Sequence, residues 1–297
     1  MIKSATSLES DRMRLAIVTP SFYLDYEVCR LLIDSVARHV PAEVPHYVIV
    51  SGEDFDLFKS CAGARTHVLV QEDIVTEKFW RLPFARRWRF NWKTLPVRGW
   101  IWQQLVKMSI GNAIDADGFM IVDSDCFFVR AFDPRSMIVD GKIPMYREQK
   151  DWYRTNSDTQ KWAEVSRRLL RLPAWPGPYD VGYVIPWAFW RRDVLLKLQT
   201  HLCNGRDQSA WLRSIARSVT FSEYMLYGIY VDHVLGLDGS GHYPYGVHIC
   251  HETWKMSPLS DEELADFRGG LTPDHVMVMI NAKSSTPIAR LRGAFGY

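Results

Sequence analysis

The sequence predicts a single large α/β domain with a mostly parallel sheet and helices on both faces. Short apolar runs that stop at turn residues alternate with stretches of helical periodicity, and this alternation is typical of a parallel sheet covered by helices. The chain has 297 residues, of which 47% are apolar. This composition supports a sizeable core and excludes a disordered or collagen-like chain.

In the first half, each predicted element is short and clearly bounded. An apolar run over 14–19 predicts a buried strand that ends at Pro20. Residues 25–40 predict a helix, because apolar side chains recur at positions 28, 31, 32 and 36, and Pro41 ends the pattern. Further elements are predicted in the order strand 46–50, short helix 54–60, strand 67–71, helix 99–110 and strand 119–122.

The second half is less regular. Helices are predicted near 158–171, 191–202, 207–217 and 222–230, with a Pro/Gly-rich loop and a short strand between the first two. Residues 247–254 predict a strand end and loop, followed by an acidic helix at 260–268 and an apolar strand at 275–280. We expect a tail at 1–12, one domain over 13–258 and an extension, 259–297, packed on that domain.

Charge and cysteine content exclude several classes of protein. The 36 basic and 34 acidic residues leave a net charge of +2, which gives no reason to expect nucleic-acid binding. The sequence contains no run of 18 apolar residues, so no membrane-spanning helix is expected. Residues 1–14 lack the apolar region of a secretory signal, so none is expected there. Five scattered Cys residues predict reduced thiols, a cytoplasmic location and no Cys-based zinc site.

The strongest chemical signal is FMIVDSDCFF at 119–128. Asp123 and Asp125 directly follow a predicted buried strand, where carboxylates are costly unless something pairs with them. In an open α/β sheet, ligands bind beyond the carboxyl ends of the strands. Two carboxylates there can hold a hard divalent cation, whose shell diphosphate oxygens and water would complete. The alternative is that one Asp caps a turn and the other is solvated.

At these residues the sequence resembles a known family. Residues 121–134, IVDSDCFFVRAFDP, are similar to the D-x-D region of GT-A glycosyltransferases, which have a Rossmann-like fold and use nucleotide-sugar donors with Mn²⁺ or Mg²⁺. More closely, the chain resembles a bacterial glycosyltransferase-like family of largely unassigned function. The segments that carry this second resemblance are IVTPSFYLDYE at 17–27, GWIWQQLVKM at 99–108 and FSEYMLYGIYV at 221–231.

The resemblance assigns roles in donor binding. It divides 13–258 into a nucleotide-binding half, 13–130, and an acceptor and catalytic half, 131–258. It makes Asp125 a metal ligand and places Asp123 against the donor ribose or the metal. The remaining donor-binding candidates are Thr19, Pro20, Asp25, Gln103, Gln104 and Lys107. Lys107 suits a diphosphate as a point charge, although a solvated helix face explains it equally well.

The resemblance also implies the catalytic residues. Glu223 opens a predicted helix where related enzymes carry an acid that deprotonates the acceptor hydroxyl, which would imply inversion at the anomeric carbon. The structural alternative is that Ser222 caps this helix and that Glu223, in the first turn, interacts favourably with the helix dipole. Asp180 is a second catalytic candidate, and Gly182 resembles the glycine loop that lets backbone approach the sugar. An ordinary tight turn also explains Gly182.

Two histidines are candidates for a further metal ligand. Many GT-A enzymes take a ligand from a His near the end of the catalytic core, with a Trp several residues on. His248 fits this spacing to Trp254, and His251 is its competitor. Imidazole is a good Mn²⁺ ligand and a poor Mg²⁺ ligand, so either His would favour Mn²⁺.

Residues 78–98 contain seven basic residues, six aromatics and no acid. A surface loop with its aromatics folded into the core explains this segment without any function. Functional interpretations are an acceptor site or an anionic membrane surface, because Trp and basic residues favour the lipid interface. A single-stranded nucleic acid fits locally but does not explain the D-x-D motif, so no nucleic acid is expected.

Together these features predict a metal-dependent glycosyltransferase with a nucleotide-sugar donor, a UDP-sugar in preference to a GDP-sugar. The expected acceptor is a hydroxyl of a glycan or lipid-linked saccharide in bacterial surface polysaccharide or glycolipid synthesis. The expected location is cytoplasmic, including the inner face of the cytoplasmic membrane. Two alternatives stay open, a haloacid-dehalogenase-type phosphohydrolase that uses Asp123 and Asp125, and a non-catalytic binding module.

Overall fold

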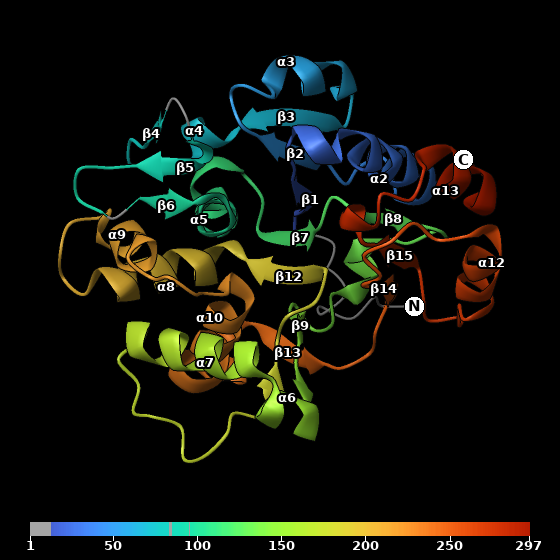
Figure 1. Cartoon of the computed structure of the whole chain (residues 1–297). Helices are drawn as coiled ribbons and strands as arrows, with labels where there is room; N and C mark the ends of the chain where they lie inside the picture. Colours follow the sequence, from blue (N-terminus) through green and yellow to red (C-terminus); the bar gives the residue numbers. More distant parts are fainter. Residues whose placement is uncertain (1–12, 83–84, 95) are drawn as a thin grey trace, which may run out of the picture.

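A five-stranded sheet forms the centre of the molecule (Figure 1). The computed structural model describes residues 13–82, 85–94 and 96–297, without the side chains of 82 and 85–87. The expected tail at 1–12 lies outside the described residues. The strand order is β12-β7-β1-β2-β3, and only β12 runs antiparallel to its neighbour. The bounds are β1 Leu15–Pro20, β2 His46–Val50, β3 Thr66–Val70, β7 Gly118–Val122 and β12 Trp187–Arg191.

Alternate residues of the central strands enter two different cores. In β7, Phe119 and Ile121 belong to a large core with the helices on one face, whereas Met120 and Val122 belong to a second core on the other face. A strand buried on both faces has no polar side to display, which explains its unbroken apolar run. The large core is formed with α5 Gly99–Ala113, α7 Ser157–Leu169, α8 Arg192–Cys203, α9 Ala210–Ala216 and α10 Glu223–Tyr230.

The second face is covered by α2 (Tyr26–His39) and by a small mixed sheet. This small sheet has the order β14-β15-β8, with β8 Cys126–Phe128, β14 Cys250–Thr253 and β15 Met277–Ile280. Strand β15 therefore lies between a strand that follows the D-x-D motif and a strand that follows His248. The C-terminal elements α12 (Asp261–Gly269) and α13 (Ile288–Phe295) complete this side, which Figure 1 shows in orange and red.

Three further pairings shape the rest of the chain. β4 Trp80–Leu82, β5 Ala85–Phe90 and β6 Val97–Arg98 form an antiparallel sheet, so the described part of 78–98 is not the loop that the structural interpretation expects. The other pairs are β9 Ile143–Tyr146 with β13 His242–Tyr245, and β10 Glu148–Gln149 with β11 Val181–Gly182. The short helices are α3 Phe55–Phe58, α4 Gln71–Ile74, α6 Asp151–Thr155 and α11 Leu237–Ser240.

All five Cys residues are free thiols, and four of them are buried. In the part of the chain that the structure describes, no helix is both long and apolar enough to cross a membrane.

Candidate functional site

The Asp-Ser-Asp motif forms a tight turn between two buried strands. β7 ends at Val122, and the Asp123 N–H donates to the Pro186 carbonyl over 2.9 Å. The Cys126 N–H then donates back to the Asp123 carbonyl over 3.1 Å, and β8 begins. Because β7 and β8 are buried, this turn holds both carboxylates at the carboxyl end of the central sheet.

Lys107 contacts several polar side chains on one side of this turn. It lies on α5, and its ammonium group is 3.0 Å from an oxygen of each of three side chains, Asp123, Glu223 and Tyr224. An ammonium has three donors, so these acceptors use all of them. Burial works to lower the pKa of Lys107, but the charges of Asp123, Tyr224 and Glu223 outweigh it and raise that pKa well above its ordinary range. A diphosphate would have to displace one of these acceptors.

Glu223 begins α10 and is only 4% exposed. The Ser222 side chain caps the helix by accepting from the Met225 N–H, so the structural role proposed for this position is present. The Glu223 N–H donates to Gln104 Oε1 over 3.1 Å. Among the described atoms, Gln104 Nε2 is buried and has no hydrogen-bond partner, which leaves its two N–H donors available beside Glu223.

Asp25 and Asp125 add further negative charge on the other side of the turn. The Ser124 hydroxyl donates to Asp25 Oδ2 over 3.0 Å, which ties the end of the first loop to the motif. Burial, and then the charge of Asp123, raise the pKa of Asp125 to about 7, with Asp25 contributing less. The pKa of Asp25 is also raised, chiefly by burial, while Ser124 opposes the shift.

The C-terminal extension reaches this site, which the sequence did not indicate. Two backbone N–H groups donate to Asp125, that of Ala282 to the carboxylate over 3.0 Å and that of Ile280 to the carbonyl over 3.2 Å. Lys283 follows, and its charge opposes the rise in the pKa of Asp25 that burial causes. The signal that could have indicated this is the apolar strand at 275–280, since a buried strand must pair with a neighbour.

The residues at the turn fit a divalent cation that is shared with a ligand. Within the described residues, no three His, Cys, Asp or Glu side chains are grouped so that they could hold a metal by themselves. However, Mg²⁺-type sites commonly use one or two carboxylates and complete the shell with water and phosphate oxygens. Burial, and then the charge of Asp123, raise the pKa of Asp125, and a cation bound at Asp123 and Asp125 would favour the charged carboxylate instead.

The two histidine candidates lie in different environments. His248 Nε2 is 3.0 Å from the Tyr146 hydroxyl and 3.5 Å from Glu148. His251 instead packs on Phe267, with ring centroids 4.3 Å apart, and on His275 at 5.0 Å. His251 thus faces the C-terminal helix α12, whereas His248 lies against Tyr146 and Glu148.

A second polar cluster surrounds His248 and was missed by sequence reasoning. Glu148 accepts hydrogen bonds from the hydroxyls of Tyr146 and Tyr153, each over 3.0 Å. Burial raises the pKa of Glu252, a neighbour of His248, although a hydrogen bond from Trp254 opposes the shift. No motif joins these positions, because the pairing of distant strands brings them together.

Gly182 lies on β11, in the same region, and Asp180 directly precedes that strand. Asp180 accepts hydrogen bonds from Gln149 over 3.0 Å and from Arg154 over 2.7 Å. These contacts lower the pKa of Asp180, and the hydrogen bond from Gln149 has the largest effect. A Cβ at Gly182 would lie 2.1 Å from the Tyr153 ring. The absent side chain therefore makes room for Tyr153, which in turn donates to Glu148.

The remaining donor-binding candidates line the end of β1 and one face of α5. Thr19 is fully buried, and its hydroxyl lies 2.9 Å from His46 Nε2 inside the sheet, so that only its backbone could border a nucleotide. Pro20 ends β1 and is buried, and Gln103 is half-buried on α5. The structure brings Asp25, Gln104, Lys107, Asp123, Asp125 and Glu223 into one connected set.

The fold defines the class of protein. The chain has the GT-A fold, and an active-site mutant of LgtC matches it with a TM-score of 0.50 at 11% identity, over 95% of each chain. The predicted fold class is thereby confirmed. The galactosyltransferase LgtC with donor and acceptor sugar analogues matches with a TM-score of 0.48 at 11% identity, again over 95% of each chain.

Glucosyl-3-phosphoglycerate synthase from Mycobacterium tuberculosis, solved with Mn²⁺, UDP and glucosyl-3-phosphoglycerate, matches over 98% of this chain and 83% of its own. Its TM-score is 0.46 and its identity 14%. Residues 14–243 match a family model, and the chain belongs to that family of unknown function, DUF6492. No curated protein matches the sequence. The chain is thus similar in fold to LgtC.

Proposed function

We propose that the protein is a metal-dependent glycosyltransferase that moves a sugar from a nucleotide-sugar to a hydroxyl of a glycan or lipid-linked saccharide. The observation that carries the proposal is the Asp123-Ser124-Asp125 turn at the carboxyl end of β7, joined to Asp25 on one side and to Lys107 and Glu223 on the other. The GT-A fold supports it. A UDP-sugar is the first donor to test, ahead of a GDP-sugar, and surface polysaccharide or glycolipid synthesis is the proposed setting.

Asp123 and Asp125 would hold a divalent cation, Mn²⁺ or Mg²⁺, together with the diphosphate of the donor. When bound, such a cation stabilises the negative charge of the leaving nucleoside diphosphate. The Ala282 N–H holds this turn at Asp125 and the hydrogen bond to Asp25 holds it at Ser124, so that little reorganisation of the turn is needed on binding. A role for His248 as a further ligand would favour Mn²⁺.

Glu223 is the proposed base, and its expected consequence is inversion at the anomeric carbon. A carboxylate within hydrogen-bond reach of the acceptor hydroxyl can take its proton as the new bond forms. The ion pair with Lys107 fixes Glu223 close to Asp123, and therefore close to the donor. Because Glu223 is nearly buried, its pair with Lys107 has to loosen before the carboxylate reaches an acceptor.

The test is release of nucleoside diphosphate from UDP- and GDP-sugars, with and without Mn²⁺. We expect Mn²⁺-dependent UDP release, which Asp125→Asn should lower by at least about a hundredfold, in the range typical for loss of an electrostatic contact. The matched control is Asp238→Asn, which alters a fully exposed carboxylate and should behave as the wild type.

Two results would contradict the proposal. Donor binding without release or transfer would indicate a non-catalytic binding module. Hydrolysis of phosphomonoesters without donor binding would indicate the phosphohydrolase alternative, which the GT-A fold does not support.

A further inference from the structure

The sheet β4-β5-β6 has a reversed distribution of aromatic and charged side chains. Its register places Trp80 opposite Phe90 and Arg81 opposite Arg89. Successive side chains of a strand point to opposite faces, so Trp80 and Phe90 share one face and Arg81 and Arg89 the other. The face with the arginines is turned toward the protein, because Arg89 is 5% exposed and lies over the buried Trp102 ring.

The carboxylates beside this sheet are engaged by the inner arginines. Glu72 lies 3.4 Å from Arg81 and 3.8 Å from Arg89, and Glu53 forms a further ion pair with Arg81. The negative charge is therefore directed to the inner face and neutralised there. This leaves the outer face to aromatic rings and cations.

The outer face exposes indole rings with cations placed beside them. Trp92 is 81% exposed and Trp80 is 41% exposed, with ring centroids 6.3 Å apart. The Lys78 ammonium lies 5.7 Å from the Trp80 ring, and the Arg98 guanidinium lies 5.6 Å from the Trp88 ring. A soluble surface rarely exposes a group of large aromatic side chains without a partner for them.

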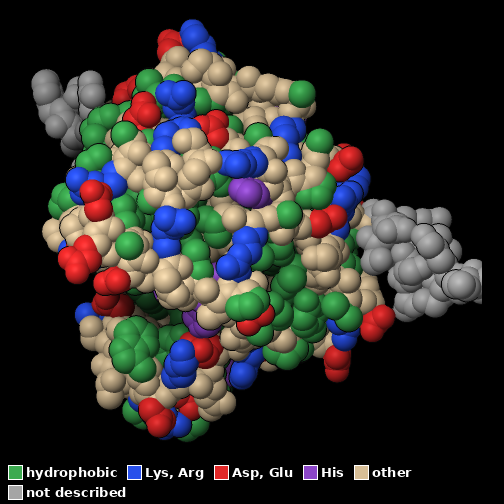
Figure 2. Space-filling model, turned by 90° about the vertical axis from the view of Figure 1, so that its right-hand side faces the viewer, with side chains coloured by type: hydrophobic (Ala, Val, Ile, Leu, Met, Phe, Trp, Pro, Cys, Tyr) green, Lys and Arg blue, Asp and Glu red, His purple; other side chains and the backbone are tan. Residues whose placement is uncertain are grey.

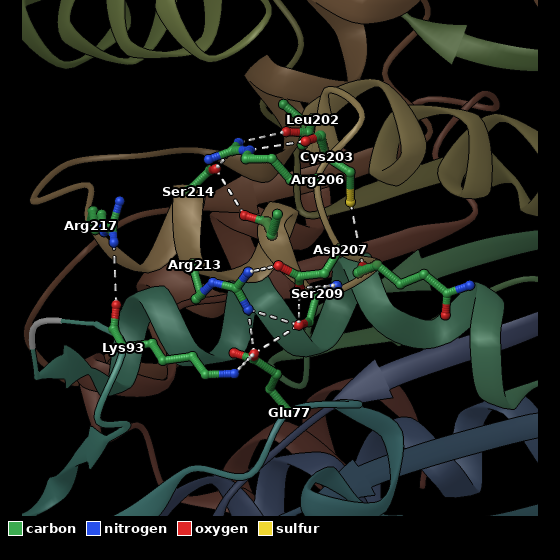
Figure 3. Close-up of polar contacts among 12 residues, drawn as sticks. Glu77, Lys93, Leu202, Cys203, Arg206, Asp207, Ser209, Arg213, Ser214 and Arg217 are labelled. Atoms are coloured by element: carbon green, nitrogen blue, oxygen red, sulfur yellow. Dashed lines mark hydrogen bonds and ion pairs between the residues drawn. The ribbon is translucent and has the colours of Figure 1, made fainter.

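The end of this sheet is fixed to helix α9, as Figure 3 shows. Glu77 accepts from the Ser209 hydroxyl over 2.7 Å and from Arg213 over 2.5 Å, and the Lys93 ammonium lies 3.5 Å away. Arg217 donates to the Lys93 carbonyl over 3.4 Å. These contacts hold the exposed rings in place and add the exposed Arg217 to their border.

We propose that this aromatic platform docks the protein on an anionic lipid bilayer. The platform is defined by its rings and cations, Trp80, Trp88, Phe90, Trp92, Lys78, Lys93, Arg98 and Arg217. Indole rings favour the headgroup region, and each cation near an anionic surface strengthens binding by roughly fivefold. The inference does not depend on the proposed transferase activity.

Charge distribution favours this partner over a general protein contact. Figure 2 shows the side of the molecule away from β4–β6, where Lys and Arg stand among Asp and Glu. On the platform, by contrast, Lys78 and Arg98 lie over or beside aromatic rings, while Glu53 and Glu72 are paired on the inner face. Lys93 lies at the border of the platform, beside Glu77. Charge complementarity thus points to a negatively charged surface with an interfacial layer that accepts indoles.

The test is co-sedimentation of the full chain with vesicles of phosphatidylcholine alone or mixed with phosphatidylglycerol. We expect binding only to the phosphatidylglycerol vesicles and weaker binding at high salt. Trp80→Ala/Trp92→Ala and Lys78→Gln/Lys93→Gln should each weaken it by about tenfold or more. The matched controls are Trp152→Ala, which removes a 60% exposed Trp elsewhere, and Lys59→Gln/Lys161→Gln. These controls should bind as the wild type does.

Failure of the wild type to bind phosphatidylglycerol vesicles would overturn the proposal. So would equal losses in the platform variants and in their controls. Binding of a single-stranded oligonucleotide that the platform variants lose, without any vesicle binding, would assign the surface to nucleic acid instead. Thermal unfolding of each variant separates a lost contact from a lost fold.

Discussion

The buried Lys107 side chain forms ion pairs with two carboxylates, those of Asp123 and Glu223. Its side chain and that of Glu223 are each 6% exposed, and Asp123 is 34% exposed. Removing one partner of a buried ion pair leaves an uncompensated charge, which commonly costs several kcal/mol. Lys107 therefore fixes the geometry of the site before any ligand binds.

We predict that Lys107→Met lowers the free energy of unfolding by about 3 kcal/mol without any ligand present. Urea unfolding measures it. Combining Lys107→Met with Glu223→Gln should restore part of the loss, because the remaining buried charge is then removed. Unchanged stability of the single variant would mean that Lys107 acts only on a bound phosphate.

Glu223 lies at the start of α10 and is also the proposed base, and experiments can separate its structural role from its catalytic one. Glu223→Gln should keep Mn²⁺-dependent donor binding and lose transfer, since an amide cannot accept the proton of the acceptor hydroxyl. Its control is Ser222→Ala, which removes the helix cap and should cost about 1 kcal/mol of stability with transfer retained. Normal turnover of Glu223→Gln would remove this residue as the base.

At the scale of elements, the C-terminal extension contributes directly to the Asp-Ser-Asp turn. Ala282 begins a 3₁₀ helix, Ala282–Ser284, and its N–H donates to Asp125. Proline suits the first position of a helix, and the ψ of 119° at Asn281 suits a residue before proline. Ala282→Pro thus removes one hydrogen bond with little strain.

We predict that Ala282→Pro folds normally and weakens Mn²⁺-dependent donor binding by roughly tenfold, in line with loss of a hydrogen bond to a charged group. Calorimetric titration of the donor measures this. Ser285→Ala, which alters an exposed neighbouring residue outside this contact, is the control and should bind the donor as the wild type does. Wild-type affinity in Ala282→Pro would show that the extension plays no part in the site.

Elements with a clear period could be predicted from the sequence. The strand predicted at 46–50 is β2, and the helix predicted at 25–40 is α2, because each has one unambiguous apolar pattern. The sheet at 80–98 could not be predicted, since its aromatics face outward and Arg89 faces inward, the reverse of the usual pattern. Within the site, the Asp-Ser-Asp turn could be predicted locally. Glu148, Glu252 and Ala282 could not, because long-range pairing places them.

At the scale of the whole molecule, two buried histidines make stability depend on pH. Burial, and then Arg65, lower the pKa of His46 to about 3, and burial lowers that of His242 to about 4. The unfolded chain binds these protons near pH 6.5, so it gains protons before the folded state does. Stability is complete above that pH and falls as the pH decreases toward 4.

We predict that each of these histidines lowers the free energy of unfolding by about 1.4 kcal/mol per pH unit between roughly pH 6 and pH 4. Urea unfolding at several pH values should therefore show a smaller slope in His46→Gln than in the wild type. An identical slope would mean that His46 is protonated in the folded protein.

The central claim is that the Asp-Ser-Asp turn binds a nucleoside diphosphate together with a divalent cation. Thermal unfolding with UDP, GDP, CDP or ADP, each with and without Mn²⁺, tests it most directly. A ligand at 100 times its Kd adds about 2.7 kcal/mol, which for a chain of this size is a shift of roughly 4 °C. We predict such a shift with UDP only when Mn²⁺ is present, and none in Asp125→Asn. No shift with any nucleotide, or a shift that Asp125→Asn retains, would contradict the claim.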